Sequence, residues 1–170
     1  IRAGMGFVTE DRKRQGLLLE DSICANISLA ILRKISKWLV VDRKRERACA
    51  EEQRGLLRIK TPNVDVKAAS LSGGNQQKIV LAKWLAADCK VIFMDEPTRG
   101  VDVGAKGEIY RLMNELTRKG IAIVMVSSEM EELLGMSDRL IVLHEGRQMK
   151  ELSRAEFSQE TVMQYASGIA

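Results

Sequence analysis

Three short apolar runs separated by helix-length segments most constrain how this chain can fold. The runs lie at residues 91–94, 121–126 and 140–143, and the segments 103–118 and 129–136 between them have helical patterning. Strands that alternate with helices of this length favour a parallel sheet buried on both faces. The sequence therefore predicts an α/β fold with a mainly parallel sheet.

The first half of the chain has a different, mostly helical pattern. Pro62 and Asn63 signal a break in it, and Ser72 is a suitable N-cap for a helix that runs to about Ala87. The other expected elements are a strand at 6–9, a polar loop at 10–16, helices at 22–34, 42–58 and 160–167, and a turn at 145–147 into one more strand. We predict one partial domain over 1–170, with a helical part at about 14–88, an α/β part at about 89–152 and a tail at 153–170.

Composition indicates a globular protein of the reducing cytoplasm. Of the 170 residues, 45% are hydrophobic and 29% charged, and no apolar run approaches the roughly 20 residues that span a bilayer. The three cysteines are widely spaced and form no Cys-x-x-Cys pair, so neither a disulfide framework nor a zinc site is indicated. The opening residues resemble neither a signal peptide nor an initiator region, and we expect an excised segment of a longer protein.

The charge is unevenly distributed. Residues 1–60 hold 14 Lys/Arg against 8 Asp/Glu, and residues 61–170 hold 13 against 15. A basic first third is compatible with a nucleic-acid or anionic-membrane surface. The alternative is a solvated helical face, which the interleaved acid in the run 43–47 and an aromatic content of only 4% favour. We expect no nucleic-acid partner.

The run from Leu71 to Lys78 reads LSGGNQQK and opens a predicted helix. Unpaired backbone N–H groups and the positive end of the helix dipole favour an anion there. Gly73 and Gly74 let the backbone approach a phosphate closely, while Ser72 and Asn75 add side-chain donors. A plain helix cap is the alternative for this run taken alone.

Asp95 and Glu96 follow an apolar strand, at the end of the sheet where ligands collect in open α/β folds. Two adjacent carboxylates there can have different roles. Asp95 would hold Mg²⁺ directly or through water, and Glu96 would orient or deprotonate an attacking water. Adjacent solvated acids are the alternative.

A phosphate-binding loop of the form Gly-x-x-x-x-Gly-Lys-Ser/Thr does not occur in the sequence. The segment 100–106, GVDVGAK, resembles one superficially, but its second glycine is at 104 and Gly107 follows the lysine. We therefore reject it as a nucleotide cradle. Asp102 within it is a good N-cap for the helix 103–118.

Taken together, LSGGNQQK, the run VIFMDEPT at 91–98 and Gly100–Asp102 resemble the signature, Walker B and D-loop of ATP-binding cassette (ABC) ATPases. The resemblance implies a P-loop NTPase-like cassette fragment that lacks the Walker A strand, loop and helix. It also implies roles for the matching residues: Glu96 is catalytic, Asp95 binds Mg²⁺, and Asp102 lies at the interface of two cassettes. The signature residues that would contact ATP held by the partner cassette are Leu71, Ser72, Gly73, Gly74, Asn75 and Gln76.

Two positions depart from the common ABC pattern. Ser128 stands where the family usually places the switch histidine that contacts the γ-phosphate, and Glu10 stands at the position of the Q-loop glutamine. His144, at the end of a later strand, is interpreted as structural. The ATP site built on this chain's own carboxylates is therefore expected to be altered.

These departures, with EDRKR at 10–14 and DEPTRGVDVGAK at 95–106, resemble the second cassette of the tandem ATPases of bacterial sugar importers, ribose-type. The resemblance implies ATP and Mg²⁺ as ligands and a peripheral place on the cytoplasmic side of the cell membrane. It implies as partners the first cassette or its dimer mate, transmembrane permease subunits that contact a groove near residues 23–35, and indirectly a periplasmic sugar-binding protein.

Two other functions are compatible with parts of the sequence: a soluble ABC ATPase acting on nucleic acid or ribosomes, and a non-catalytic, signature-bearing regulatory module. The isolated segment is expected to be inactive and to self-associate through uncovered apolar surface. The sequence does not name the sugar.

Overall fold

The computed structural model describes residues 1–169, which divide into two compact units, Ile1–Met125 and a second that begins at Val126. A three-stranded sheet contains two of the three apolar runs from which a parallel sheet was predicted, while the third run forms β6 (Arg139–His144) in a separate two-stranded sheet. The strands of the three-stranded sheet are β1 (Met5–Val8), β4 (Val91–Asp95) and β5 (Ala122–Val126), in the order β1-β4-β5. β1 and β4 pair in parallel, which confirms a parallel sheet in this part of the chain.

The sheet is buried on one face only, which differs from the expected burial on both faces but agrees with the apolar surface that this segment was expected to leave uncovered. Gly6 and Ile92 point to the buried face, and a Cβ on Gly6 would lie 2.9 Å from Trp84 Cβ, so helix α4 packs directly on β1. The side chains of the other face reach solvent. Its exposed members are Met5, Phe7, Phe93 and Val124.

Three long helices of the first unit begin where capping residues allow. They are α3 (Arg43–Leu56), α4 (Gly73–Ala86) and α5 (Val103–Arg118). The carboxylates of Asp42 and Asp102 accept backbone N–H groups of the first turns of α3 and α5. After α5, Gly120 adopts φ +86°, the left-handed conformation that ends many helices.

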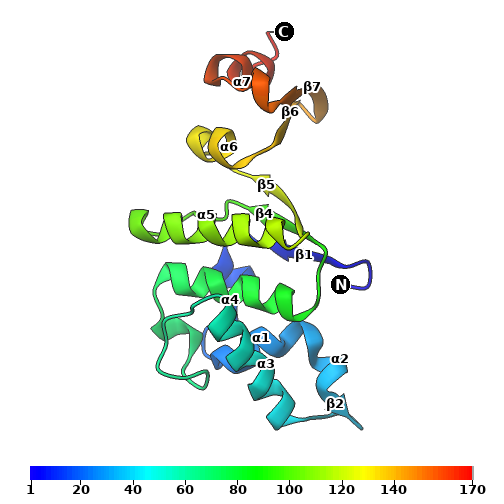
Figure 1. Ribbon diagram of the computed structural model, residues 1–170, viewed down its shortest axis with the longest axis vertical. Coiled ribbons are helices and arrows are strands. Elements are labelled where there is room, and N and C mark those ends of the chain that lie inside the picture. Colours follow the sequence, from blue (N-terminus) through cyan, green and yellow to red (C-terminus); the bar gives the residue numbers. More distant parts are fainter. Residues whose placement is uncertain (170) are drawn as a thin grey trace. The chain divides into compact units, whose positions relative to one another are not determined.

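The predicted helix 22–34 is interrupted. The structure has α1 (Ile23–Ser28), a 3-10 turn (Leu29–Ile31) and α2 (Leu32–Ile35) in its place. Ile23, Ile27, Ile31 and Ile35 are all buried, and α1 packs against α3 and α4. Figure 1 shows α1, α2 and α3 grouped together next to α4. The isoleucines therefore form the core of the helical part.

Three further local features were not predicted. A hairpin joins β2 (Ser36–Lys37) to β3 (Val40–Val41), and Trp38 and Leu39 at its tip have positive φ without the Asn or Gly that signals such a turn. The loop 10–16 contains a π-helical turn, η1 (Arg12–Gly16). A short 3-10 turn at Ala68–Ser70 precedes the signature run.

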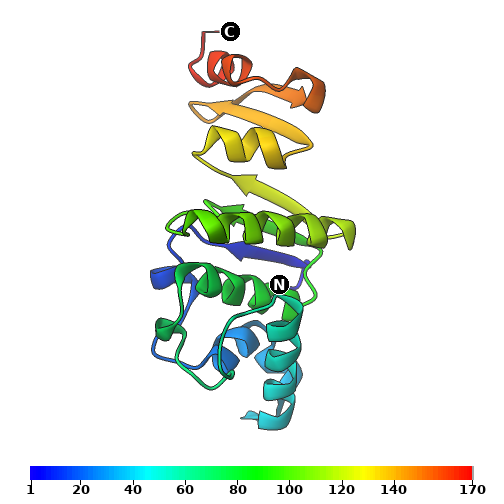
Figure 2. The same ribbon diagram turned by 60° about the vertical axis from the view of Figure 1, so that its left-hand side comes forward.

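The second unit contains α6 (Met130–Met136), β6 (Arg139–His144), β7 (Arg147–Ser153), a 3-10 turn (Arg154–Glu156) and α7 (Gln159–Ala166). β6 and β7 pair antiparallel, as the predicted turn at 145–147 requires, and so the third apolar run forms a hairpin. Figure 2 shows this hairpin beside α7. Leu140, Val142 and Leu152 form a small core with Val162 of α7.

Within residues 1–169, no helix has the length and apolar character needed to cross a membrane. The functional subdivision at 14–88, 89–152 and 153–170 follows motifs and not contacts, and it stays a prediction.

Candidate functional site

Ser72 is the N-cap of α4, as predicted, but its hydroxyl does not cap the helix. The Ser72 carbonyl accepts the Gln76 N–H at 2.9 Å, while the Ser72 Oγ accepts the Asn75 side-chain amide at 3.0 Å. The first backbone N–H groups of α4 are thus not taken up by the Ser72 side chain. An uncapped helix start of this kind can bind an anion.

The other signature residues differ in what they offer to a ligand. Asn75 Oδ1 accepts the backbone N–H of Lys60 at 2.9 Å, which fixes the orientation of its amide. Gln76 is 4% exposed and its Nε2 donates to Ala68 O at 3.2 Å, so its side chain is held inside the protein. Leu71, before the cap, is extended. Ser72 and the two glycines are therefore the members best placed to meet a phosphate.

The signature glycines lie against the segment 100–105. A Cβ on Gly73 would lie 2.7 Å from Gly100 O, and a Cβ on Gly74 would lie 2.8 Å from Ala105 Cβ. Asp102, between these contacts, accepts the Ala105 N–H at 2.9 Å and so caps α5 as predicted. Only glycine permits this approach, because any larger residue at 73 or 74 would displace its neighbours.

The two predicted carboxylates lie where β4 ends. Asp95 is the last residue of the strand, and Glu96 follows with φ +47°, an unusual conformation for a residue with a side chain. Glu96 O then accepts the Arg99 N–H at 3.1 Å, which closes a turn toward Gly100. Strained backbone of this kind occurs preferentially at functional sites.

Glu10 lies at the same edge of the sheet as Asp95, because β1 and β4 are parallel and Val8 is paired with Met94. Its carboxylate forms an ion pair with Arg99. A pocket of about 480 Å³ lies at this contact, and it is lined by Glu10, Asp11, Arg12, Lys13, Arg99 and Gly100. The Q-loop position is thus joined directly to the turn that precedes Asp102.

Arg12 is a residue to which the sequence reasoning assigned no role. Its guanidinium donates to Arg99 O at 2.6 Å and to Gly100 O at 2.9 Å. The side chain is 7% exposed, and burial lowers the pKa of the guanidinium while Asp11 opposes the shift. The only signal in the sequence was its place in the run EDRKR.

Ser128 follows β5 and belongs to the second unit, so it is described apart from the carboxylates. Beside it, the Ser127 hydroxyl donates to the buried carboxylate of Glu132 and accepts the Glu129 N–H at 3.0 Å. His144 Nδ1 lies 2.8 Å from Ala166 O, so its ring is held by α7. That contact agrees with the structural role predicted for His144.

The acid at the end of β4 is a carboxylate, a ligand type that Mg²⁺ uses. Among residues 1–169, no group of three or more His, Cys, Asp and Glu side chains could hold a metal ion. Mg²⁺ usually takes one or two carboxylates and completes its shell with water and phosphate oxygens. Asp95 with a nucleotide's phosphates fits that pattern.

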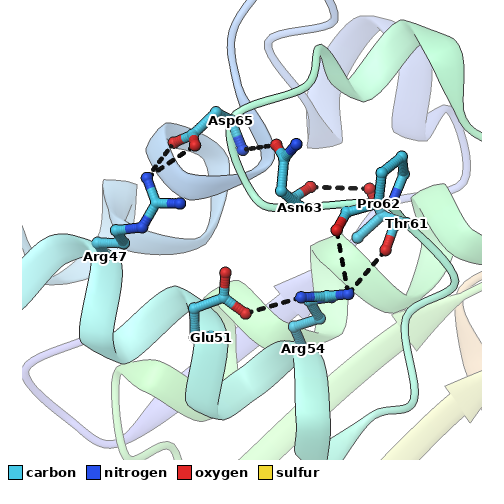
Figure 3. A network of polar contacts seen from close by, with 7 residues as sticks. All are labelled: Arg47, Glu51, Arg54, Thr61, Pro62, Asn63 and Asp65. Carbon is cyan, nitrogen blue, oxygen red and sulfur yellow. Dashed lines mark hydrogen bonds and ion pairs between the residues drawn. The ribbon is translucent and has the colours of Figure 1, made fainter.

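Several basic side chains of the first third form ion pairs with nearby acids. Arg47 binds both carboxylate oxygens of Asp65, at 2.9 and 2.7 Å, and Arg54 joins Glu51 to the carbonyls of Thr61 and Pro62 (Figure 3). These contacts hold α3 against the loop 61–65. They support the interpretation of this region as a solvated helical face.

Comparison with known proteins agrees with these motifs. A family model described as ABC transporter matches residues 1–99. The ribose import ATP-binding protein RbsA of Bacillus subtilis is 54% identical over 168 residues, covering 99% of this chain and 34% of that protein. The xylose import ATP-binding protein XylG of Geobacillus kaustophilus is 49% identical over 168 residues, covering 99% and 33%. The chain thus spans about a third of the length of these curated relatives.

Solved structures share the fold. An ATP-binding cassette of an ABC transporter, MJ1267, superposes with a TM-score of 0.77 at 22% identity, covering 96% of this chain and 68% of that chain. The cassette MJ0796, in a dimeric post-hydrolysis state bound to ADP and phosphate, gives a TM-score of 0.72 at 23% identity, covering 90% and 64%. At these identities the likeness establishes the fold alone.

Proposed function

The chain belongs to the ABC transporter family, and from that premise we propose that it forms part of an ATPase that drives the import of a monosaccharide. Relatives about half identical to it are named as ribose and xylose import ATP-binding proteins, which supports this substrate class. Because the chain covers only a third of those relatives, the proposal concerns the whole protein of which this cassette segment is a part. That protein would work at the cytoplasmic side of the cell membrane.

The observation that carries the proposal is the joined arrangement of signature and D-loop. Gly73 and Gly74 lie in contact with Gly100 and Ala105, and the start of α4 presents N–H groups that the Ser72 side chain does not cap. We infer that this surface closes on ATP held by a partner cassette, either the first cassette of the same polypeptide or its dimer mate. Ser72, Gly73 and Gly74 would donate hydrogen bonds to the γ-phosphate and stabilise charge on the transferring group.

The carboxylates serve a second, different site in this proposal. Asp95 would hold Mg²⁺, which would neutralise charge on the phosphates when bound. Glu96 would accept a proton from, or orient, the attacking water. With Ser128 in place of a histidine and Glu10 at the Q-loop position, this site is the weaker of the two.

Transport requires contact with permease subunits, and the helical part is the proposed docking region. The isoleucines of 23–35 are buried in the core, so a docking surface there would use the exposed Leu18 and Leu29. The periplasmic sugar-binding protein would act only indirectly, through the permease. We propose no role in nucleic-acid binding.

The test is a substitution in the signature of the full-length protein, assayed as ATP turnover. Ser72→Ala removes a phosphate donor and is expected to lower kcat by about tenfold or more. Ser70→Ala is the matched control, since the Ser70 hydroxyl only closes a local turn onto Lys67 O. If Ser72→Ala keeps kcat within about twofold of the parent, the signature does not contact ATP as proposed.

A further inference from the structure

Arg12 is a buried cation that the proposed chemistry does not use. It opens the π-helical turn Arg12–Gly16, two residues after Glu10, and is 7% exposed. Its two terminal nitrogens donate to the carbonyls of Arg99 and Gly100, which lie 87 and 88 positions further along the chain. A single side chain therefore joins the loop after β1 to the turn before Asp102.

This burial is unfavourable for stability. Both acceptors are neutral carbonyls, and Arg12 Nε is buried with no hydrogen-bond partner within residues 1–169. Burying a charged group costs free energy, and the adjacent Asp11 offsets this cost only in part, because burial has the larger effect on the Arg12 pKa. The neighbours Lys13 and Arg14 in the same turn are exposed, so the fold does not bury basic residues here in general. A costly buried group points to a role other than stability.

The Arg12 guanidinium also lies directly against Gly73 of the signature. A Cβ on Gly73 would lie 2.6 Å from Arg12 Nη2, and the same Cβ would lie 2.7 Å from Gly100 O. Arg12, Gly73 and Gly100 are thus packed as closely as glycine allows. A movement of any one of them displaces the others.

The far end of the π-helical turn is fixed as well. Lys83 of α4 is 8% exposed, and its Nζ donates to Gly16 O at 2.8 Å. A Cβ on Gly16 would lie 3.1 Å from Val80 Cγ2, also of α4. The turn is therefore held at one end by the segment before Asp102 and at the other by the signature helix.

We propose that Arg12 is a positioning residue that couples the loop after β1, and with it this cassette's own ATP site, to the signature and D-loop offered to the partner's ATP. The inference rests on the proposed function. In it, Arg12 contacts no nucleotide. A change in the Glu10 loop shifts Arg12, and Arg12 shifts the carbonyls of Arg99 and Gly100 together with Gly73.

The physical basis is the steep dependence of phosphoryl transfer on position. Catalytic donors lose much of their effect when displaced by about 1 Å. A link between two sites appears as a coupling of about 5- to 150-fold between the ligands that bind them. Loss of Arg12 is thus expected to remove cooperativity between the two ATP sites and to leave ATP affinity at each site nearly unchanged.

The experiment uses the full-length ATPase assembled with its permease in nanodiscs and compares Arg12→Met, Arg12→Lys and Lys13→Met. The readouts are kcat, KM and the Hill coefficient for ATP, with binding of a fluorescent ATP analogue and the unfolding temperature as folding controls. For Arg12→Met we expect a Hill coefficient near 1 and kcat lowered about tenfold, with the affinity for the first analogue molecule bound within about twofold of the parent. Arg12→Lys, which can reach one carbonyl, is expected to recover part of the cooperativity and part of kcat. Lys13→Met is expected to match the parent in both.

Each other outcome is decisive. A parent without ATP cooperativity, or an Arg12→Met protein whose Hill coefficient stays at the parent value, overturns the coupling role even if kcat falls with the folded fraction. Both results leave the proposed function standing. A parent whose ATP turnover does not respond to sugar-loaded binding protein contradicts the proposed function itself, whatever Arg12 does.

Discussion

Gly73 shows how a single residue sets the geometry of the proposed phosphate site. The position its Cβ would occupy is already filled by Arg12 Nη2 at 2.6 Å and by Gly100 O at 2.7 Å. Its φ is not among the positive values of the chain, so the requirement for glycine here is one of space and not of backbone conformation. The same holds at Gly6, where Trp84 occupies the space.

We therefore predict that Gly73→Ala lowers the free energy of unfolding by about 1–3 kcal/mol, because the added methyl forces Arg12 and Gly100 apart. Gly107→Ala is the matched control, since a Cβ there meets nothing within 4 Å and Gly107 lies inside α5. That control is expected to raise stability by about 0.5–1 kcal/mol. Urea unfolding of the isolated chain measures both, and equal effects of the two substitutions would contradict the close packing.

At the scale of elements, the signature helix is held against α5 by a charged contact. Lys78 Nζ of α4 lies 2.8 Å from Glu108 Oε2 of α5, and Lys60 Nζ lies 3.1 Å from Glu108 Oε1. The hydrogen bonds from Lys78 and Lys60 lower the pKa of Glu108 from 4.5 to about 2. The Lys78 ammonium is buried, so this carboxylate is the group that compensates its charge.

The lowered pKa of Glu108 predicts how the stability of the fold depends on pH. A carboxyl whose pKa is lower in the folded state stabilises the fold fully above its unfolded pKa of 4.5, and the stabilisation is lost as the pH falls toward 2. Glu108→Gln should therefore be less stable than the parent at neutral pH and lose less stability over that acid range. Urea midpoints at a series of pH values test this, with the exposed Glu115→Gln on the same helix as the control. Parallel curves for parent and Glu108→Gln would rule the contact out as a source of acid sensitivity.

At the scale of the whole molecule, the uncovered face of the sheet is the apolar surface most apt to promote association of this chain. Phe7 and Phe93 are paired in register on β1 and β4 and are 48% and 39% exposed, with Met5 and Val124 on the same face. Contiguous apolar surface of this kind promotes association. The expected self-association of the isolated segment thus has a defined surface.

We predict that Phe7→Ser with Phe93→Ser shifts the isolated chain toward the monomer, because it removes the two largest apolar side chains from that face. Light scattering after size-exclusion chromatography measures the change. Replacing Trp38 and Leu39 by serine at the hairpin tip is the control, since these side chains are even more exposed but lie on another element. A parent that is already a clean monomer would remove the basis for the prediction.

The sequence by itself determined the local chemistry of this protein. Asp102 could be predicted as an N-cap because its carboxylate accepts a backbone N–H three residues on. The position of Ser72 before α4 was also predictable, although its side chain forms no capping hydrogen bond. Asp95 could be predicted at a strand end because the apolar run stops there. The turn at 145–147 was predictable because its glycine is a local turn signal. The roles of the signature, Glu96, Ser128 and the other motif residues came from family resemblance and stay predictions.

Only the tertiary structure decided what is joined across long separations. The bonds from Arg12 to Arg99 and Gly100 span 87 and 88 residues, and no local pattern reports which distant carbonyls a side chain will meet. The broken helix at 23–35 and the Trp38–Leu39 hairpin tip were missed because packing overrode local propensity at both of them. The physical reason is that local structure follows from neighbouring residues, whereas the coupling between Glu10, Arg12, Gly73 and Gly100 exists only once three segments are packed together.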